Sequence, residues 1–222
     1  MKSLIYKIYI KFVLFCFGIL RGLRLIEFYQ PMPQLKISLR KKGQERRVLA
    51  RWNAMEKALP DDIQNAMDIG CNVGFYAFSL AQRGYFVTGI EGGPVYHIFS
   101  HHAKEALGLN NVSLAKLLVT PDNVKTLPGA DCVLLLAVFH HWCRAFGKES
   151  ALEMLDEIYR KTGKVLFFET GEGGENYAKS LPDMGDSPEN WIRELFLSKG
   201  CNEVKVISDP ENGRTLVAVY KP

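Results

Sequence analysis

The 222 residues of the chain suffice for one sizeable core, and 47% apolar with 23% charged residues is the balance of an ordinary globular domain. The net charge of +4 is unevenly distributed, because residues 1–51 hold 12 Lys or Arg and two acidic residues, whereas residues 52–222 hold 16 basic and 22 acidic residues. This split suggests a basic arm on an acidic body, with a nucleic acid or a membrane as candidate partners, and five cysteines without C-x-x-C spacing disfavour a disulfide framework or a zinc site.

The N-terminal segment, residues 1–30, predicts an amphipathic helix. Its uninterrupted apolar run, residues 12–20, is about half as long as a helix must be to cross a bilayer. Helical spacing places Lys7, Lys11 and Arg21 on one stripe, while nearly every other residue is aromatic or aliphatic. We therefore expect a helix that lies in a membrane interface. A helix docked on the protein's own core and a signal peptide are the alternatives, and the second lacks a small-residue cleavage pattern.

Residues 31–59 predict a basic linker followed by a helix from about Gln44 to Leu59. Two prolines open the segment. A basic run is usually a solvated face, but its closeness to the apolar helix favours an anionic membrane surface as its partner. The basic residues are Lys36, Arg40, Lys41, Lys42, Arg46, Arg47 and Arg51.

A glycine-rich turn follows, between a strand and a helix. Residues 66–69 form a short apolar run typical of a buried parallel strand, and Gly70 and Gly74 then bracket the turn. A side chain at either glycine would keep the backbone away from a ligand. Apolar residues recur at helical spacing over residues 75–82, so the turn leads into a helix N-terminus.

A second strand, residues 85–90, ends in an acid. Glu91 stands 17 residues beyond Gly74, where a carboxylate can accept hydrogen bonds from both hydroxyls of a ribose. The glycine pattern is D-x-G-x-x-x-G and not the G-x-G-x-x-G of dinucleotide folds. Asp68 would repel a pyrophosphate and attract the cationic sulfonium and amino group of S-adenosylmethionine.

The stretch Asp68-Ile69-Gly70-Cys71-Asn72-Val73-Gly74 resembles motif I of the class I S-adenosylmethionine-dependent methyltransferases, with Glu91 as the acid that closes their second strand. The resemblance implies a catalytic domain over residues 60–222, built on a doubly wound, seven-stranded, mostly parallel α/β sheet. S-adenosylmethionine is the implied cofactor. The expected cofactor-binding residues are Asp68, Gly70, Cys71, Asn72, Gly74, Phe75, Tyr76, Glu91, Gly92, Asp122, Asn123 and Ala137.

The remaining elements continue the alternation of strands and helices. Asp122 and Asn123 follow a third strand, where either could pair with the adenine amino group or cap a local turn. We expect helices at 95–107, 148–159 and 189–199, and strands at 112–119, 131–142, 164–170, 203–208 and 215–220.

The apolar run 131–142 reads as the central strand, and it ends in two histidines. Its carboxyl end lies where ligands of open α/β sheets bind, so Ala137 should border the methyl donor. Much of a methyl transfer is positioning, and the histidines are candidate catalytic groups because their pKa lies near neutrality. Side chains alternate along a strand, so we expect His140 on the acceptor side and His141 on the cofactor side or packed.

The block from Val138 to Tyr177, with its VFHH sequence, resembles the methyltransferase domains that terminate O-antigen chains in lipopolysaccharide synthesis. RNA 5′-phosphate methyltransferases resemble it more loosely. The resemblance implies a glycan or phosphate-bearing acceptor, either a small molecule or lipid-linked. From the N-terminal helix and the basic stretch we expect a cytoplasmic enzyme that is peripheral on the inner face of the cytoplasmic membrane. No kinase domain or coiled coil, as in the O-antigen enzymes, is expected here. An RNA methyltransferase and a non-catalytic cofactor-binding scaffold are the alternatives, and the lack of an RNA-binding module disfavours nucleic acid as the partner.

Overall fold

The computed structural model describes residues 2–39, 42–171, 178–185, 187–208 and 214–222, which contain a single seven-stranded sheet. The strand order is β3-β2-β1-β4-β5-β7-β6, and β7 alone runs antiparallel to its neighbours. The doubly wound, mostly parallel sheet is thereby confirmed. The strands are β1 Asn65–Ile69, β2 Phe86–Glu91, β3 Val112–Lys116, β4 Ala130–Leu136, β5 Thr162–Glu169, β6 Glu203–Val206 and β7 Leu216–Tyr220.

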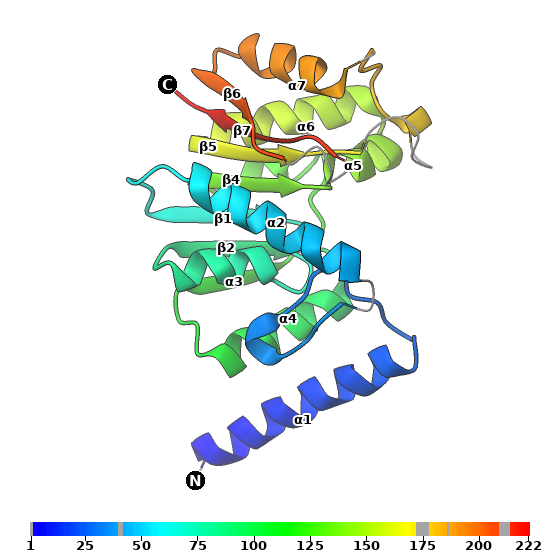
Figure 1. Cartoon of the computed structure of the whole chain (residues 1–222), viewed down its shortest axis with the longest axis vertical. Helices are drawn as coiled ribbons and strands as arrows, with labels where there is room; N and C mark the ends of the chain where they lie inside the picture. Colours follow the sequence, from blue (N-terminus) through cyan, green and yellow to red (C-terminus); the bar gives the residue numbers. More distant parts are fainter. Residues whose placement is uncertain (1, 40–41, 172–177, 186, 209–213) are drawn as a thin grey trace.

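Helices cover both faces of the sheet (Figure 1). Helices α2, α3 and α4 pack on one face, with α1 beyond α4, while α5, α6 and α7 pack on the other. The helices are α1 Lys2–Gly22, α2 Lys42–Ala58, α3 Phe75–Gln82, α4 Pro94–Leu107, α5 Phe139–Phe146, α6 Lys148–Lys161 and α7 Pro188–Leu197, and three short 3₁₀ turns lie at Pro33–Leu35, Val124–Thr126 and Ala178–Ser180.

The alternation of side chains in β5 shows why helices cover both faces of the sheet. Val165 and Phe167 point into the core beneath α2 and α3, whereas Leu166 and Phe168 point into the core beneath α6 and α7. All four are fully buried. A continuous apolar run of this kind belongs to a parallel strand with helices on both faces.

The expected strand 131–142 is wrong in its second half, because β4 ends at Leu136 and both histidines lie in helix α5. The break falls at Ala137, whose φ is +57° and whose amide donates to the carbonyl oxygen of Glu169 at 2.9 Å. A left-handed residue ends the extended conformation, and a helix begins two residues later. The third strand is also shorter than expected and ends at Lys116. The other expected elements lie within a few residues of their predicted ends.

Helix α1 docks on α4 through one face and leaves the opposite face uncovered. The Phe99 ring of α4 contacts the rings of Phe17 at 5.3 Å and Phe28 at 4.6 Å between centroids. Among the described residues no helix is long and apolar enough to cross a membrane. Through these ring contacts, one face of α1 is docked on the protein's own core, as the alternative prediction for this helix had it. The other face exposes Ile8, Phe12, Phe15, Ile19 and, just past the helix, Leu23.

Replacing Phe99 by Ala should lower the free energy of unfolding by about 3–5 kcal/mol, because the fully buried ring joins the N-terminal segment to α4. Chemical denaturation followed by circular dichroism measures the change. Phe86→Ala is the control, since Phe86 is 70% exposed and its loss should have little effect. Equal stability of the two variants would contradict the docking of α1 on α4.

Candidate active site

The turn after β1 requires glycine for reasons that lie within the protein. Gly70 and Gly74 have φ values of +74° and +93°, which side chains rarely adopt. A Cβ at Gly70 would lie 2.6 Å from Val138, and one at Gly74 would lie 2.7 Å from the Phe78 ring. Both glycines are therefore fixed by backbone conformation and packing, in addition to the space that a ligand would need.

The turn is tied to β2 by hydrogen bonds. The amides of Gly70 and Cys71 both donate to the carbonyl oxygen of Ile90, at 2.8 and 3.0 Å. At the other end of the turn, Phe75 opens helix α3 and donates its amide to Gln30 Oε1 at 3.0 Å. Gln30 could not be predicted from sequence patterns, because it lies in the irregular segment between α1 and α2.

The carboxylate of Glu91 bridges the glycine turn and the end of β2. Its Oε2 accepts from the amide of Asn72 at 2.7 Å, and its Oε1 accepts from the amide of Gly93 at 2.6 Å. Each carboxylate oxygen keeps a second lone pair, so this geometry holds the group in place and still allows further hydrogen bonds.

Asp68 near the end of β1 and Asn72 in the turn that follows each carry a buried side-chain oxygen. Asp68 is 2% exposed, and neither its Oδ2 nor the buried Oδ1 of Asn72 has a hydrogen-bond partner among the described residues. Burial, with a smaller contribution from the charge of Glu91, raises the pKa of Asp68 to about 7. The Asp68 carboxylate oxygen and the Asn72 amide oxygen are both buried hydrogen-bond acceptors. They suit a cationic group with several N–H donors, such as an ammonium.

The other residues expected at the cofactor contribute backbone atoms and close packing. Cys71, Phe75 and Tyr76 are buried in the core, with only their backbone at the turn. Gly92 allows close packing, since a Cβ there would lie 3.1 Å from the Leu118 backbone. Ala137 stands at the carboxyl end of β4, as expected.

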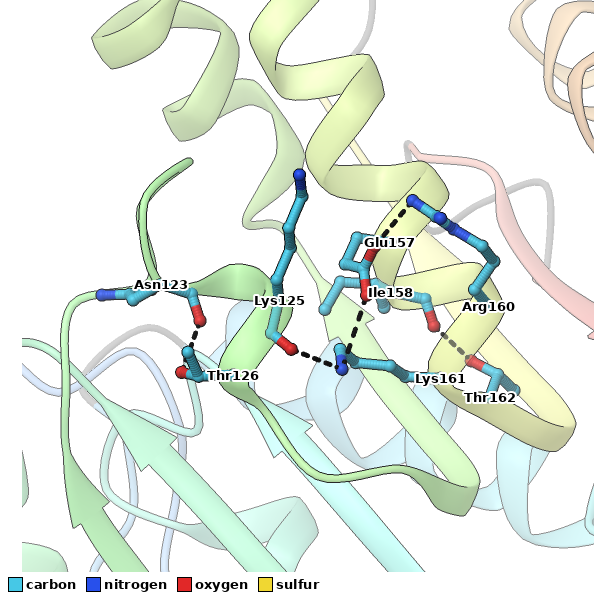
Figure 2. Close-up of polar contacts among 8 residues, drawn as sticks. All are labelled: Asn123, Lys125, Thr126, Glu157, Ile158, Arg160, Lys161 and Thr162. Atoms are coloured by element: carbon cyan, nitrogen blue, oxygen red, sulfur yellow. Dashed lines mark hydrogen bonds and ion pairs between the residues drawn. The ribbon is translucent and has the colours of Figure 1, made fainter.

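Asn123 caps a local turn through its side chain. Its Oδ1 accepts from the Thr120 amide at 2.9 Å, and its Nδ2 donates to the Leu118 carbonyl at 2.9 Å, while Asp122 is exposed. Figure 2 shows how the turn continues: the Asn123 carbonyl accepts from Thr126, and Lys161 at the end of α6 donates to the Lys125 carbonyl. In this structure the side chain of Asn123 therefore caps a local turn, which was one of the two predicted roles.

The two histidines do not alternate across a strand, because both lie in the first turn of α5. His140 is 3% exposed, and its Nδ1 accepts from the Gly171 amide at 3.2 Å. His141 is exposed at the surface, and its ring lies 4.2 Å from that of His140. Partial burial, followed by the charges of Arg144 and Arg214, lowers the pKa of His141. The buried histidine is therefore His140, opposite to the expected arrangement.

A group of charges at the end of β5 has no signal in the sequence. Glu169 is 1% exposed, and its carboxylate pairs with Arg51 of α2 at 2.6 Å and with Arg214, just before β7, at 3.5 Å. Burial raises the pKa of Glu169, and both arginines oppose the shift. Tyr76 lies next to Arg51, and its hydroxyl donates to the Val48 carbonyl in the same helix at 3.5 Å. Residues far apart in the chain thus meet at the edge of the sheet that also carries the glycine turn.

Known proteins share this fold and part of this sequence pattern. Residues 67–167 match the family model described as a methyltransferase domain. The crystal structure of WbdD is similar with a TM-score of 0.65 and 22% identity, over 87% of this chain and 44% of WbdD. The N-terminal domain of EvdMO1, solved with SAH and D-fucose, has a TM-score of 0.57 and 17% identity, over 78% of this chain and 82% of its own. Magnesium protoporphyrin IX methyltransferase (ChlM) from Synechocystis PCC 6803, with bound SAM, has a TM-score of 0.54 and 19% identity, over 78% of this chain and 76% of its own.

These likenesses establish the class I methyltransferase fold, and the chain spans less than half the length of WbdD. No curated protein matches it in sequence. The cofactor that the fold and the matching domain model indicate is S-adenosylmethionine, and the buried acceptors at Asp68 and Asn72 suit its amino group. The Glu91 carboxylate suits its ribose.

The affinity for S-adenosylmethionine should fall roughly tenfold between about pH 7.5 and about pH 6. The cation binds the ionised form of Asp68, and a group of pKa about 7 is mostly protonated at the lower pH. Isothermal titration at both pH values measures this. Asp68→Asn should bind more weakly and lose most of the pH dependence, whereas an unchanged pH dependence in that variant would show that another group titrates.

Proposed function

Residues 67–167 form a methyltransferase domain that uses S-adenosylmethionine, and from this premise we propose that the protein methylates an oxygen of a glycan or phosphate-bearing acceptor at the inner surface of a membrane. The observation that carries the proposal is the distribution of charge along the ligand-binding edge of the sheet. Carboxylates lie at the ends of β1 and β2, and two arginines pair with the buried Glu169 beside the end of β5 and the start of β7. A cationic donor suits the first half of the edge, and an anionic acceptor suits the second half.

Two further observations support this class of acceptor. WbdD is described as a bifunctional kinase-methyltransferase, and the EvdMO1 domain was solved with D-fucose, so a phosphorylating partner activity and a sugar both occur among the structural neighbours. The sequence of this chain from Val138 onward resembles the O-antigen terminating methyltransferases, which points to the same chemistry.

The side chains of the site would bind and orient the reactants. Asp68 and Asn72 hold the amino group of the cofactor, Glu91 holds its ribose, and the cofactor supplies an electrophilic methyl group. A phosphate oxygen is already an anion near neutral pH, so methyl transfer to it is a matter of positioning and needs no general base.

The histidines fit this mechanism. His140 accepts the Gly171 amide at Nδ1, which places the proton of the neutral ring on Nε2 and leaves the engaged nitrogen unable to take up another. His140 therefore positions the backbone that follows β5. His141 is the histidine that remains exposed to an acceptor, as a hydrogen-bond donor.

Purified protein with S-adenosylmethionine should produce S-adenosylhomocysteine when given phosphorylated glycans, and much less when the same glycans have been treated with phosphatase. Mass spectrometry of the glycans should show one added methyl group on the phosphate. Loss of the phosphate removes the anionic nucleophile, so the rate should drop by at least about 100-fold.

Equal turnover of the phosphatase-treated glycans would mean that a hydroxyl is the acceptor. Turnover of RNA oligonucleotides alone would favour the RNA methyltransferase. Binding of S-adenosylmethionine without turnover of any acceptor would favour the scaffold.

Membrane attachment rests on the outer face of α1. Ile8, Phe12, Phe15 and Ile19 recur at spacings of four, three and four residues, and each is between 46% and 64% exposed. The exposed basic side chains of the N-terminal segment belong to Lys11, Arg24, Lys36, Arg46 and Arg47. An exposed apolar helical face in a basic segment suits an anionic lipid surface better than it suits water.

The double variant Phe12→Ser/Phe15→Ser should bind phosphatidylglycerol vesicles at least about tenfold more weakly than the parent, because two aromatic rings no longer enter the lipid. Vesicle sedimentation measures the bound fraction. Phe86→Ser is the matched control, because Phe86 is also exposed but lies at the amino end of β2. Equal binding by the double variant and the control would exclude α1 as the attachment surface.

A further inference from the structure

Gln30 reaches the glycine turn from the irregular segment between α1 and α2. Its side chain accepts the backbone amide of Phe75, the first residue of α3, at 3.0 Å. Because a backbone amide can only donate, the atom that faces Phe75 is Oε1, and the planar amide group of the side chain places Nε2 directly beside it. The Nε2 has no hydrogen-bond partner among the described residues and, unlike the Oδ2 of Asp68 and the Oδ1 of Asn72, it is not buried. The half-buried Gln30 thus presents two N–H donors at the amino end of α3.

Most backbone amides of the glycine turn already have acceptors within the protein, which limits the donors that remain for a ligand. The amides of Gly70, Cys71 and Gly74 donate to backbone carbonyls, at 2.8 to 3.0 Å. The amide of Asn72 donates to the carboxylate of Glu91. S-adenosylmethionine carries an α-carboxylate as well as an α-ammonium, so a side chain that donates hydrogen bonds at this turn would complete its recognition.

Asp68, whose unpartnered oxygen suits the ammonium, lies at the same end of α3 as Gln30. The pKa of Asp68 is raised by burial and by Glu91, whereas the backbone amide of Ala77, in the first turn of α3, acts to lower it. That amide therefore lies close to the Asp68 carboxylate. One carbon atom of S-adenosylmethionine carries both charged groups, so a cofactor whose ammonium meets Asp68 presents its carboxylate close to the amino end of α3.

We propose that Gln30 is a cofactor-binding residue whose Nε2 donates a hydrogen bond to the carboxylate of S-adenosylmethionine. Asp68 and Asn72 supply acceptors for the ammonium, and Gln30 supplies the matching donor. A hydrogen bond to an ionised carboxylate is stronger than one between neutral groups. The segment that follows α1 would then form one wall of the cofactor site.

Contacts on the preceding residues hold Gln30 in place before any cofactor binds. The Phe28 ring packs on that of Phe99 in α4 at 4.6 Å between centroids, and the Tyr96 hydroxyl donates to the Glu27 carbonyl at 3.1 Å. A donor that is already positioned loses little entropy when its ligand arrives. The inference goes beyond the proposed function, because it concerns the cofactor and does not depend on which acceptor is methylated.

Isothermal titration at about pH 7.5 tests this with S-adenosylmethionine and its decarboxylated analogue, which keeps the sulfonium and the ammonium and lacks the carboxylate. Gln30→Glu retains an oxygen for the Phe75 amide but replaces the donor by a carboxylate. It should bind S-adenosylmethionine at least about tenfold more weakly than the parent and the analogue at least as tightly, because the analogue has only positive charges. Gln30→Ala should also weaken S-adenosylmethionine about tenfold and change the affinity for the analogue by less than about threefold.

Gln34→Ala is the matched control, because Gln34 lies in the same segment and donates to Gln82 at the other end of α3, at 3.0 Å. It should bind both ligands as the parent does. Parent-like affinity of Gln30→Glu for S-adenosylmethionine would overturn the inference and assign the carboxylate to backbone amides of the turn. An equal loss of affinity for both ligands in Gln30→Ala would show that Gln30 only holds α3 in position. Absence of S-adenosylmethionine binding by the parent would overturn the inference as well.

Discussion

Parallel pairing of β2, β1, β4 and β5 brings the carboxyl ends of these strands to one edge of the sheet, and the site depends on this constraint. Ile90 strengthens it, because its carbonyl accepts the amides of Gly70 and Cys71 and so ties the turn after β1 to the end of β2. Glu91 then fixes the turn from the other side through the Asn72 amide. Carboxylates stand at the ends of β1 and β2, whereas the carboxylate at the end of β5, Glu169, is paired with two arginines.

The same edge contains groups whose placement costs stability. Asp68 is buried, has one oxygen without a partner in the described part of the chain and has its pKa raised to about 7, and Ala137 occupies a left-handed conformation that costs about 1–2 kcal/mol. Glu169 is buried as well, and its two arginines offset the loss of hydration. A cation bound next to Asp68 would relieve part of this cost, which is the behaviour expected of a site built for a ligand.

The N-terminal segment contributes to the site and to the surface at once. Gln30 accepts the first amide of α3, and Arg51 of α2 pairs with Glu169, so residues ahead of the first strand reach the ligand-binding edge. Helix α1 of the same segment packs on α4 (Figure 1), and its apolar stripe is exposed. Attachment to a membrane through α1 would hold the site at the lipid surface without a spanning helix.

The sequence alone predicts the strand, turn and helix from Ala66 to Gln82 and the acid at Glu91, because glycine spacing and apolar periodicity are local and each element is short. It also determined the doubly wound sheet, through the alternation of strands and helices. The folded structure was needed to establish where β4 ends, since a buried strand and a buried helix are equally apolar in sequence. The break at Ala137 depends on its hydrogen bond to the distant Glu169, which only the folded structure shows. It alone brought Arg51 and Arg214 to one carboxylate, because that contact joins residues distant in sequence, whose spacing carries no period.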